Sequence, residues 1–110
     1  IVTAFNEALN RHNVDAVMAL MTEDVVFENT FPAPDGTTYS GAAAVRAFWV
    51  EFLRATPRAR FVEEELFATG DRCVVRWRFE WDDSGGHVRV VDVMRVRDGK
   101  VAEKLSYVKG

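Results

Sequence analysis

The second half of the chain contains four strand-like segments joined by very short links, and this arrangement narrows the possible folds more than any other feature. The segments cover residues 58–68, 72–81, 88–97 and 100–108. The last link is Asp98-Gly99, a dipeptide favoured in two-residue hairpin turns. Parallel neighbours would need crossovers of a dozen or more residues. We therefore expect the four strands to form an antiparallel meander.

The first half carries three helical patterns. Apolar residues at helical spacing predict helices over residues 2–12 and 14–21. A third helix is expected between Ser40, a plausible N-cap, and Pro57, which closes it. Its apolar residues follow the pattern i, i+3, i+4, i+7 and i+8: Val45, Phe48, Trp49, Phe52 and Leu53.

One further strand and one loop complete the pattern. Residues 25–29 have strand chemistry, and residues 31–39 contain two prolines and Asp-Gly, which indicates a loop. The predicted order is αα-β-α-ββββ, in which three helices cover one face of a curved sheet. We expect a single α+β domain over residues 1–110.

Composition limits the classes of protein to which the chain can belong. It is 48% hydrophobic and 28% charged, which is typical of a globular domain, and its net charge of −3 argues against nucleic acid as a partner. Its single cysteine, Cys73, excludes an internal disulfide and fits a reducing compartment. No apolar run is long enough to span a bilayer, and no secretory signal opens the sequence. We expect a cytoplasmic protein without a membrane partner.

Asp92 is the most informative single residue. In the strand over residues 88–97 it is the only polar member of the face that also holds Val88, Val90, Met94 and Val96. An ionised carboxylate among apolar side chains costs several kcal/mol unless it is paired or hydrogen-bonded. Asp92 is therefore expected either at the wall of a small-molecule cavity or in a structural contact with backbone amides or an arginine.

Four stretches, residues 8–20, 23–29, 40–49 and 92–101, resemble the nuclear-transport-factor-two-like superfamily in the same order along the chain. The resemblance is to the branch of ketosteroid isomerases and SnoaL-like polyketide cyclases. It implies a cone-shaped domain whose curved, mainly antiparallel sheet wraps over three helices and encloses a pocket.

The resemblance also implies a chemistry, from which this chain departs at two positions. Ketosteroid isomerases move a proton with a carboxylate base, while a tyrosine and a protonated aspartic acid donate hydrogen bonds to the enolate. Asp92 falls at the position of the donating acid, but Phe5 replaces the tyrosine and Asn29 replaces the base. An amide cannot take up the proton and phenylalanine cannot donate one. Ketosteroid isomerase chemistry itself is therefore not expected.

The expected ligand is a hydrophobic small molecule, bound without metal or organic cofactor. If the protein is an enzyme, we expect proton transfer on an apolar carbonyl compound, either isomerisation or aldol-type cyclisation. Asp92 is then the catalytic candidate, as general acid or oxyanion donor, and Asn29 orients the substrate. The further ligand-binding candidates, for which core packing is the alternative role, are Phe5, Phe48, Trp49, Trp77 and Tyr107.

The alternative is a non-catalytic module that binds a ligand, dimerises or contacts another protein. Phe5 and Asn29 favour it, because both replace groups that the isomerases need. Arginines along the last strands suggest an ion-paired outer face, and Val91 and Val93 between them suit a homodimer interface on the exposed sheet.

The resemblance to the cyclases also implies a polar group on the last strand, where this chain offers Glu103, Ser106 and Tyr107. Glu103 shares its face with Val101, Leu105 and Tyr107, an alternation that would let it point inward near the end of the strand, and no role is assigned to it. The histidines and the cysteine lack the spacing of a zinc site.

Overall fold

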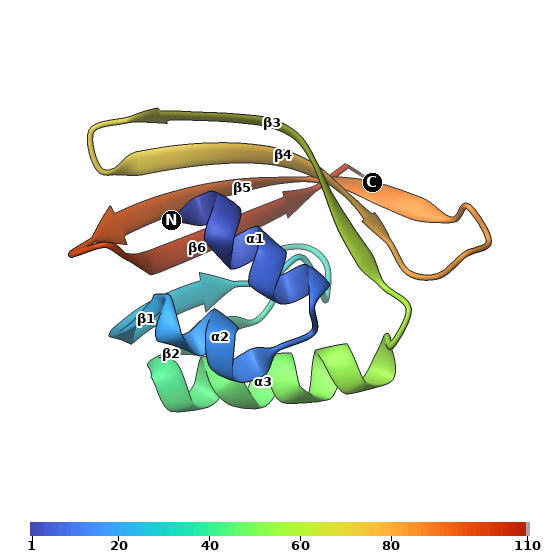
Figure 1. Cartoon of the computed structure of the whole chain (residues 1–110), viewed down its shortest axis with the longest axis horizontal. Coiled ribbons are helices and arrows are strands. Elements are labelled where there is room, and N and C mark those ends of the chain that lie inside the picture. Colours follow the sequence, from blue (N-terminus) through green and yellow to red (C-terminus); the bar gives the residue numbers. More distant parts are fainter. Residues whose placement is uncertain (110) are drawn as a thin grey trace.

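The structure contains three helices and six strands within the part of the chain that it describes, residues 1–109 of the computed structural model (Figure 1). In chain order the elements are α1 (Val2–Asn10), α2 (Val14–Ala19), β1 (Met21–Glu28), β2 (Thr38–Ser40), α3 (Ala42–Ala55), β3 (Arg60–Thr69), β4 (Arg72–Glu80), β5 (His87–Arg97) and β6 (Lys100–Val108).

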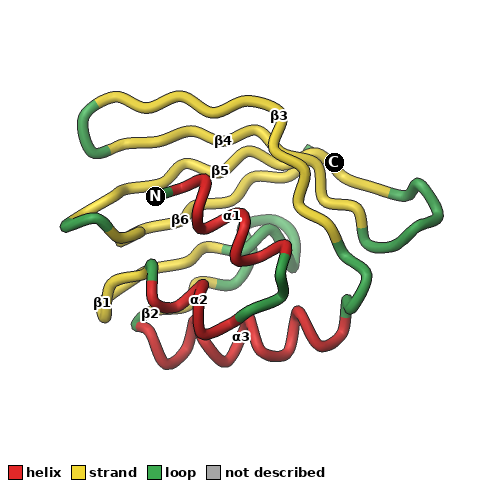
Figure 2. Tube along the Cα trace, in the orientation of Figure 1, coloured by secondary structure: helices red, strands yellow, loops and turns green. Residues whose placement is uncertain are grey.

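All six strands belong to one curved, unclosed sheet in the order β2-β1-β6-β5-β4-β3. Strands β3 to β6 form the predicted antiparallel meander, and only the pairing of β1 with β6 is parallel. The three helices lie against one side of the sheet, which bends over them (Figure 2). The α+β class with three helices under a curved, mainly antiparallel sheet is confirmed.

The β5–β6 hairpin shows why the Asp-Gly signal was reliable. Asp98 and Gly99 both have positive φ, 53° and 75°. A two-residue type I′ turn requires this conformation at both positions, and aspartate and glycine tolerate it better than most residues.

The segment after β1 differs from the prediction. Residues 38–40 form β2 rather than the end of a loop, and they pair with β1 so that Ser40 lies opposite Val26. Because Ser40 is used in this strand, Gly41 with φ of 89° is the N-cap residue of α3. The sequence does not indicate this strand, because the nearby Asp-Gly is a turn signal and only pairing with β1 makes these three residues extended.

Strand β6 contains an irregularity that reverses its predicted faces. Arg95 pairs with Glu103 but Val96 pairs with Val101, so Ala102 is an extra residue in β6. Beyond this bulge, Lys104 and Ser106 are buried, whereas Tyr107 is 54% exposed. The predicted inward face of Glu103, Leu105 and Tyr107 is therefore wrong.

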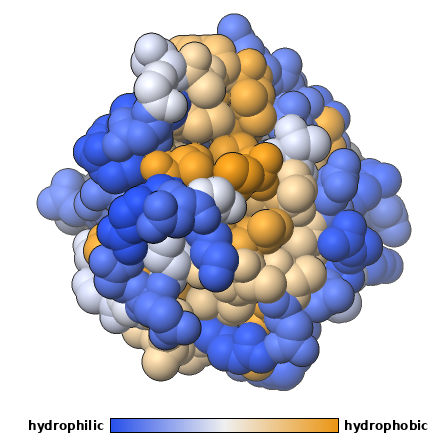
Figure 3. Space-filling model, turned by 60° about the vertical axis from the view of Figure 1, so that its left-hand side comes forward, coloured by the Kyte–Doolittle hydropathy of each residue, from blue (hydrophilic) through white to orange (hydrophobic). Residues whose placement is uncertain are grey.

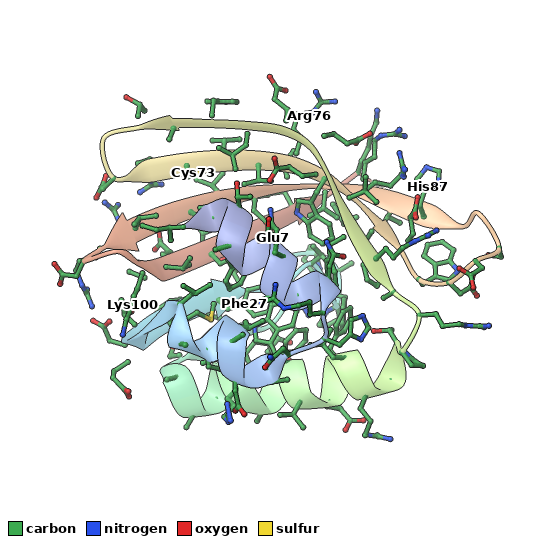
Figure 4. All side chains as sticks on the ribbon, viewed as in Figure 1. Glu7, Phe27, Cys73, Arg76, His87 and Lys100 are labelled. Atoms are coloured by element: carbon green, nitrogen blue, oxygen red, sulfur yellow. The ribbon has the colours of Figure 1, made fainter. Side chains whose placement is uncertain are left out.

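The interior is largely aromatic, and the outer face of the sheet is charged. The Phe27 ring stacks on that of Trp49 with centroids 5.4 Å apart. Figure 4 shows Phe27 between the sheet and α3, whereas Arg76 and His87 extend away from the interior. Arg76 pairs with Glu65, and Arg89 pairs with Glu64, as an ion-paired outer face requires.

Apolar side chains are not confined to the interior. On the face drawn in Figure 3, a band of apolar residues runs between hydrophilic ones.

Among residues 1–109, no helix has the length and apolar character needed to cross a membrane.

Candidate functional site

A cavity of about 310 Å³ lies between α3 and the inner face of the sheet. This volume is at the lower end of the range of roughly 300–1,000 Å³ typical of small-molecule sites. Three of its lining residues are also exposed to solvent, so the cavity reaches the surface at that end: Phe31, Trp81 and Val108. The other lining residues are Phe27, Asn29, Thr30, Phe48, Trp49, Phe52, Phe61, Trp77, Phe79, Val88, Val90, Lys104 and Ser106.

The aromatic wall follows from two simple periodicities. Phe48 and Phe52 are four residues apart on α3, and their rings stack with centroids 5.3 Å apart. Trp77 and Phe79 alternate on one face of β4, where both pack against Phe61 at 5.3 Å. The wall therefore offers flat apolar surfaces from both the helix and the sheet.

Asp92 is the centre of a buried polar network behind this wall. Its carboxylate accepts hydrogen bonds from the Ser106 hydroxyl at 2.6 Å and from the Trp77 indole N–H at 2.8 Å. The Lys104 ammonium lies 3.3 Å from the same carboxylate and donates to Ser106 Oγ at 2.9 Å. The side chains of Lys104 and Asp92 are only 3% and 2% exposed. Such a buried pair is tolerated because further hydrogen bonds satisfy both charged groups.

Lys104, rather than Asp92, reaches the cavity. Trp77, Lys104 and Ser106 line it, whereas the Asp92 carboxylate, to which all three are joined, does not. The Lys104 nitrogen lies 4.6 Å from the centroid of the Phe27 ring, within the range of a cation–π interaction. Among the cavity-lining residues in the described chain, only Lys104 has an ionisable side chain.

Two buried N–H donors, on residues that line the cavity, have no acceptor among residues 1–109. They are Nδ2 of Asn29 and Nε1 of Trp49, on residues that are 6% and 3% exposed. Asn29 Oδ1 accepts from the Thr30 N–H at 2.8 Å, which fixes the orientation of the amide. An unpaired buried donor costs about 1–3 kcal/mol. A ligand oxygen that came within hydrogen-bond distance of either donor would relieve this cost.

The sequence matches the family model of the SnoaL-like domain over residues 2–104. The chain belongs to this family. Its resemblance to the SnoaL-like branch of the nuclear-transport-factor-two-like superfamily is thereby confirmed. No curated protein matches the chain.

Solved structures agree with this SnoaL-like assignment. An NTF2-like protein of unknown function from Mesorhizobium loti is 41% identical, with a TM-score of 0.85 over 99% of this chain and 88% of its own. A putative polyketide cyclase from Sinorhizobium meliloti is 21% identical, with a TM-score of 0.80 over 98% and 92% of the two chains. TerC, co-crystallised with polyporic acid, is 20% identical, with a TM-score of 0.78 over 98% and 88%. The last two likenesses establish the fold alone.

The SnoaL-like domain brings together four of the predicted ligand-binding residues: Asn29, Phe48, Trp49 and Trp77 line the cavity. Two others lie elsewhere. Phe5 is fully buried in the core, 6.5 Å from the Trp49 ring, and does not line the cavity. Tyr107 is on the outer face of β6, because the bulge reverses that strand.

Lys104 is a polar wall residue that the sequence pattern did not predict, and Ser106 is one of the three polar groups of the last strand that were left without a role. Ser106 lies opposite Asp92 in the β5–β6 ladder. With the bulge known, the inward position of Asp92 would have identified Ser106, and with it Lys104 two residues earlier.

Glu64 and Cys73 are among the groups of this SnoaL-like domain outside the cavity that have shifted pKa values. A hydrogen bond from Arg89 lowers the pKa of Glu64 on the outer face. Burial raises the pKa of the Cys73 thiol, which disfavours the nucleophilic thiolate form at this buried position.

Proposed function

We propose that this SnoaL-like domain binds an apolar, largely aromatic small molecule that presents a carbonyl oxygen to the cavity wall. The observation that carries this proposal is the pair of buried N–H donors without acceptors, Asn29 Nδ2 and Trp49 Nε1, on two residues that line a largely aromatic cavity. An indole N–H can only donate, and so can an amide NH₂ group. The complementary ligand must therefore supply acceptors.

The nature of the wall supports the apolar part of the proposal. Phe48, Phe52, Trp77 and Phe79 present rings from two sides, and aromatic rings pack favourably against one another beyond the area that they bury. The fold shared with TerC, whose structure was determined with polyporic acid, and with a putative polyketide cyclase is consistent with a ligand of this class.

The test compares two ligands that differ in one carbonyl group, 2-acetylnaphthalene and 2-ethylnaphthalene. Calorimetric titration of the wild type and of Trp49→Phe should show weaker binding of the ketone to the variant. The expected loss is about 0.5–1.5 kcal/mol, the net value of one hydrogen bond. The binding free energy of the hydrocarbon should fall only by the small amount that the change in packing causes. Equal losses for both ligands would refute a hydrogen bond from Trp49 to the carbonyl.

A second function, cofactor-free proton transfer, is favoured by the Lys104 ammonium at the wall. A fixed cation beside a carbonyl oxygen stabilises the negative charge of an enolate, as in isomerisation or aldol-type cyclisation. Asp92 then acts as a positioning residue that holds Lys104, since its oxygens already accept from Ser106 and Trp77. No Asp, Glu or His side chain lines the cavity within the described residues. That observation favours binding without catalysis.

Deuterium exchange separates these two functions. The protein is incubated with 2-acetylnaphthalene in D₂O, and label in the methyl group is followed by NMR. Proton transfer predicts exchange that is lost in Lys104→Met and retained in the exposed control Lys100→Met. Binding without exchange above the rate in buffer would leave a non-catalytic ligand-binding module.

We also propose a homodimer through the outer face of the sheet. There the register places Val91 beside Tyr107 and Val93 beside Leu105, which forms an apolar patch among the ion pairs. Light scattering should give a dimer for the wild type and a monomer for Val93→Glu. A wild-type monomer at high concentration would contradict this proposal.

A further inference from the structure

Lys104 has the properties of a reactive amine as well as those of an ion-pair partner. Lys104 lines the cavity, and its nitrogen lies 4.6 Å from the centre of the Phe27 ring and 5.8 Å from that of Trp77. Its side chain is only 3% exposed, whereas Lys100 and Lys109, the other lysines of the chain, are exposed. A primary amine is thus placed beside the volume in which a carbonyl ligand would bind.

We propose that Lys104 forms a Schiff base with an aldehyde or ketone group of the ligand. The proposal rests on the proposed function, because it requires a carbonyl compound in the cavity. It goes beyond that function, in which Lys104 contacts the ligand only as a cation.

The aromatic wall sets the approach of the two reacting groups. A flat ligand between α3 and the sheet would pack against the Phe27, Trp49 and Trp77 rings that surround the Lys104 nitrogen. Holding an amine next to a carbonyl replaces a bimolecular encounter by a reaction within one complex, which can contribute several kcal/mol to the barrier. The cavity would therefore favour Lys104 over an exposed lysine.

The neighbours of Lys104 can accept and return the protons that the reaction moves. The ammonium first gives one proton to the Asp92 carboxylate, 3.3 Å away, which leaves a neutral amine. The nitrogen lone pair then attacks the carbonyl carbon. The C=O π pair moves to the oxygen, which takes a proton from the nitrogen, with the Ser106 hydroxyl between the groups as a relay.

Loss of water completes the reaction. The proton on Asp92 returns to the carbinolamine hydroxyl, the C–O bond breaks, and the nitrogen lone pair forms the C=N bond. The ammonium and the carbonyl compound have then become an iminium ion and one water molecule, without oxidant or reductant. The Asp92 carboxylate, still bonded by Trp77, pairs with the iminium charge as it paired with the ammonium.

If Lys104 served only as a structural ion-pair partner, the order in which the three lysines react would be reversed. A lysine sealed among Phe27, Trp49 and Asp92 without access for a ligand would be the slowest of the three lysines to react. The order in which the lysines react therefore decides between the two roles.

The experiment uses the wild-type protein with 2-naphthaldehyde and sodium cyanoborohydride, which reduces an imine to a stable secondary amine. Adducts are located by digestion and mass spectrometry, and the N-terminal amine is quantified separately. Lys104 should be modified faster than Lys100 and Lys109 by about tenfold or more, which corresponds to a barrier lower by at least ~1.4 kcal/mol. In guanidinium chloride the three lysines should react at similar rates.

Variants supply the controls. Asp92→Asn should slow the modification of Lys104 without changing that of Lys100, because it removes the proton acceptor. Lys100→Met should leave the Lys104 adduct unchanged. If Asp92→Asn does not fold, the comparison of native with unfolded wild type still decides the proposal.

A parallel calorimetric titration with 2-ethylnaphthalene, which cannot form an imine, keeps the two proposals separable. Binding of the hydrocarbon together with a selective adduct on Lys104 supports both. Binding with no preference for Lys104 overturns the Schiff base and leaves the proposed ligand cavity intact. If neither naphthalene binds and no selective adduct forms, both proposals fail.

Discussion

Replacing Asp92 by asparagine should destabilise the protein strongly at neutral pH, because it leaves the Lys104 ammonium buried without its counter-charge. The two side chains are 2% and 3% exposed, so water cannot replace the lost partner. Breaking a buried ion pair by removing one member costs about 3–5 kcal/mol. Domains are typically stable by only about 5–15 kcal/mol, so this is a large part of the total.

The hydrogen bonds to Asp92 support a loss of stability of at least about 3 kcal/mol. Ser106 and Trp77 donate to different oxygens of the carboxylate. An asparagine has one carbonyl oxygen, so one of these donors would face an NH₂ group instead of an acceptor. The loss of charge and the loss of an acceptor therefore act in the same direction.

The assay is urea unfolding at pH 7, followed by circular dichroism, for the wild type, Asp92→Asn, Lys104→Met and the double variant. Each single variant leaves one charge unpaired, whereas the double variant leaves none. We expect the double variant to be more stable than the sum of the single losses predicts, with a coupling energy of about 1–3 kcal/mol. In thermal unfolding, a loss of 3 kcal/mol corresponds to roughly 12 °C or more for a domain of this size.

Two results would refute this reasoning. One is an unfolding midpoint of Asp92→Asn equal to that of the wild type at pH 7. The other is additive losses in the cycle, within about 0.5 kcal/mol, which would show that Asp92 and Lys104 do not stabilise each other.

Three further predictions concern other parts of the molecule. Gly36→Ala should destabilise the segment after β1, because Gly36 has φ of 76° and an added Cβ would lie 1.8 Å from the Asn29 carbonyl oxygen; unchanged urea unfolding would contradict this close approach. Cys73 should react with iodoacetamide at pH 8 far more slowly in the folded than in the unfolded protein, since burial raises its pKa; equal rates would show that the thiol is accessible. The hydrogen bond from Arg89 lowers the pKa of Glu64 from its ordinary value of about 4.5. The contribution of Glu64 to folding stability is therefore present above pH 4.5 and is lost as the pH falls through the lowered pKa. Glu64→Gln should accordingly flatten the loss of stability in that acidic range, and an unchanged pH profile would exclude a contribution from this pair.

The sequence by itself determined the elements whose signals are local. The short links required the meander of β3 to β6, because no parallel crossover fits within them. Helical spacing of Phe48, Trp49 and Phe52 placed all three on the side of α3 that lines the cavity. Alternation in β5 likewise placed Asp92 on the inner face, where it is buried.

Only the tertiary structure decided which side chains Asp92 contacts. The two-residue turn pairs Arg97 with Lys100, and an unbroken ladder from that turn would place Leu105 opposite Asp92. The extra residue Ala102 shifts the register, so that Ser106 takes this place and Lys104 turns inward. Because side chains alternate along a strand, one inserted residue sends every later side chain to the other face. Such an insertion changes how two strands pair, and the alternation of apolar and polar residues along either strand alone does not reveal it.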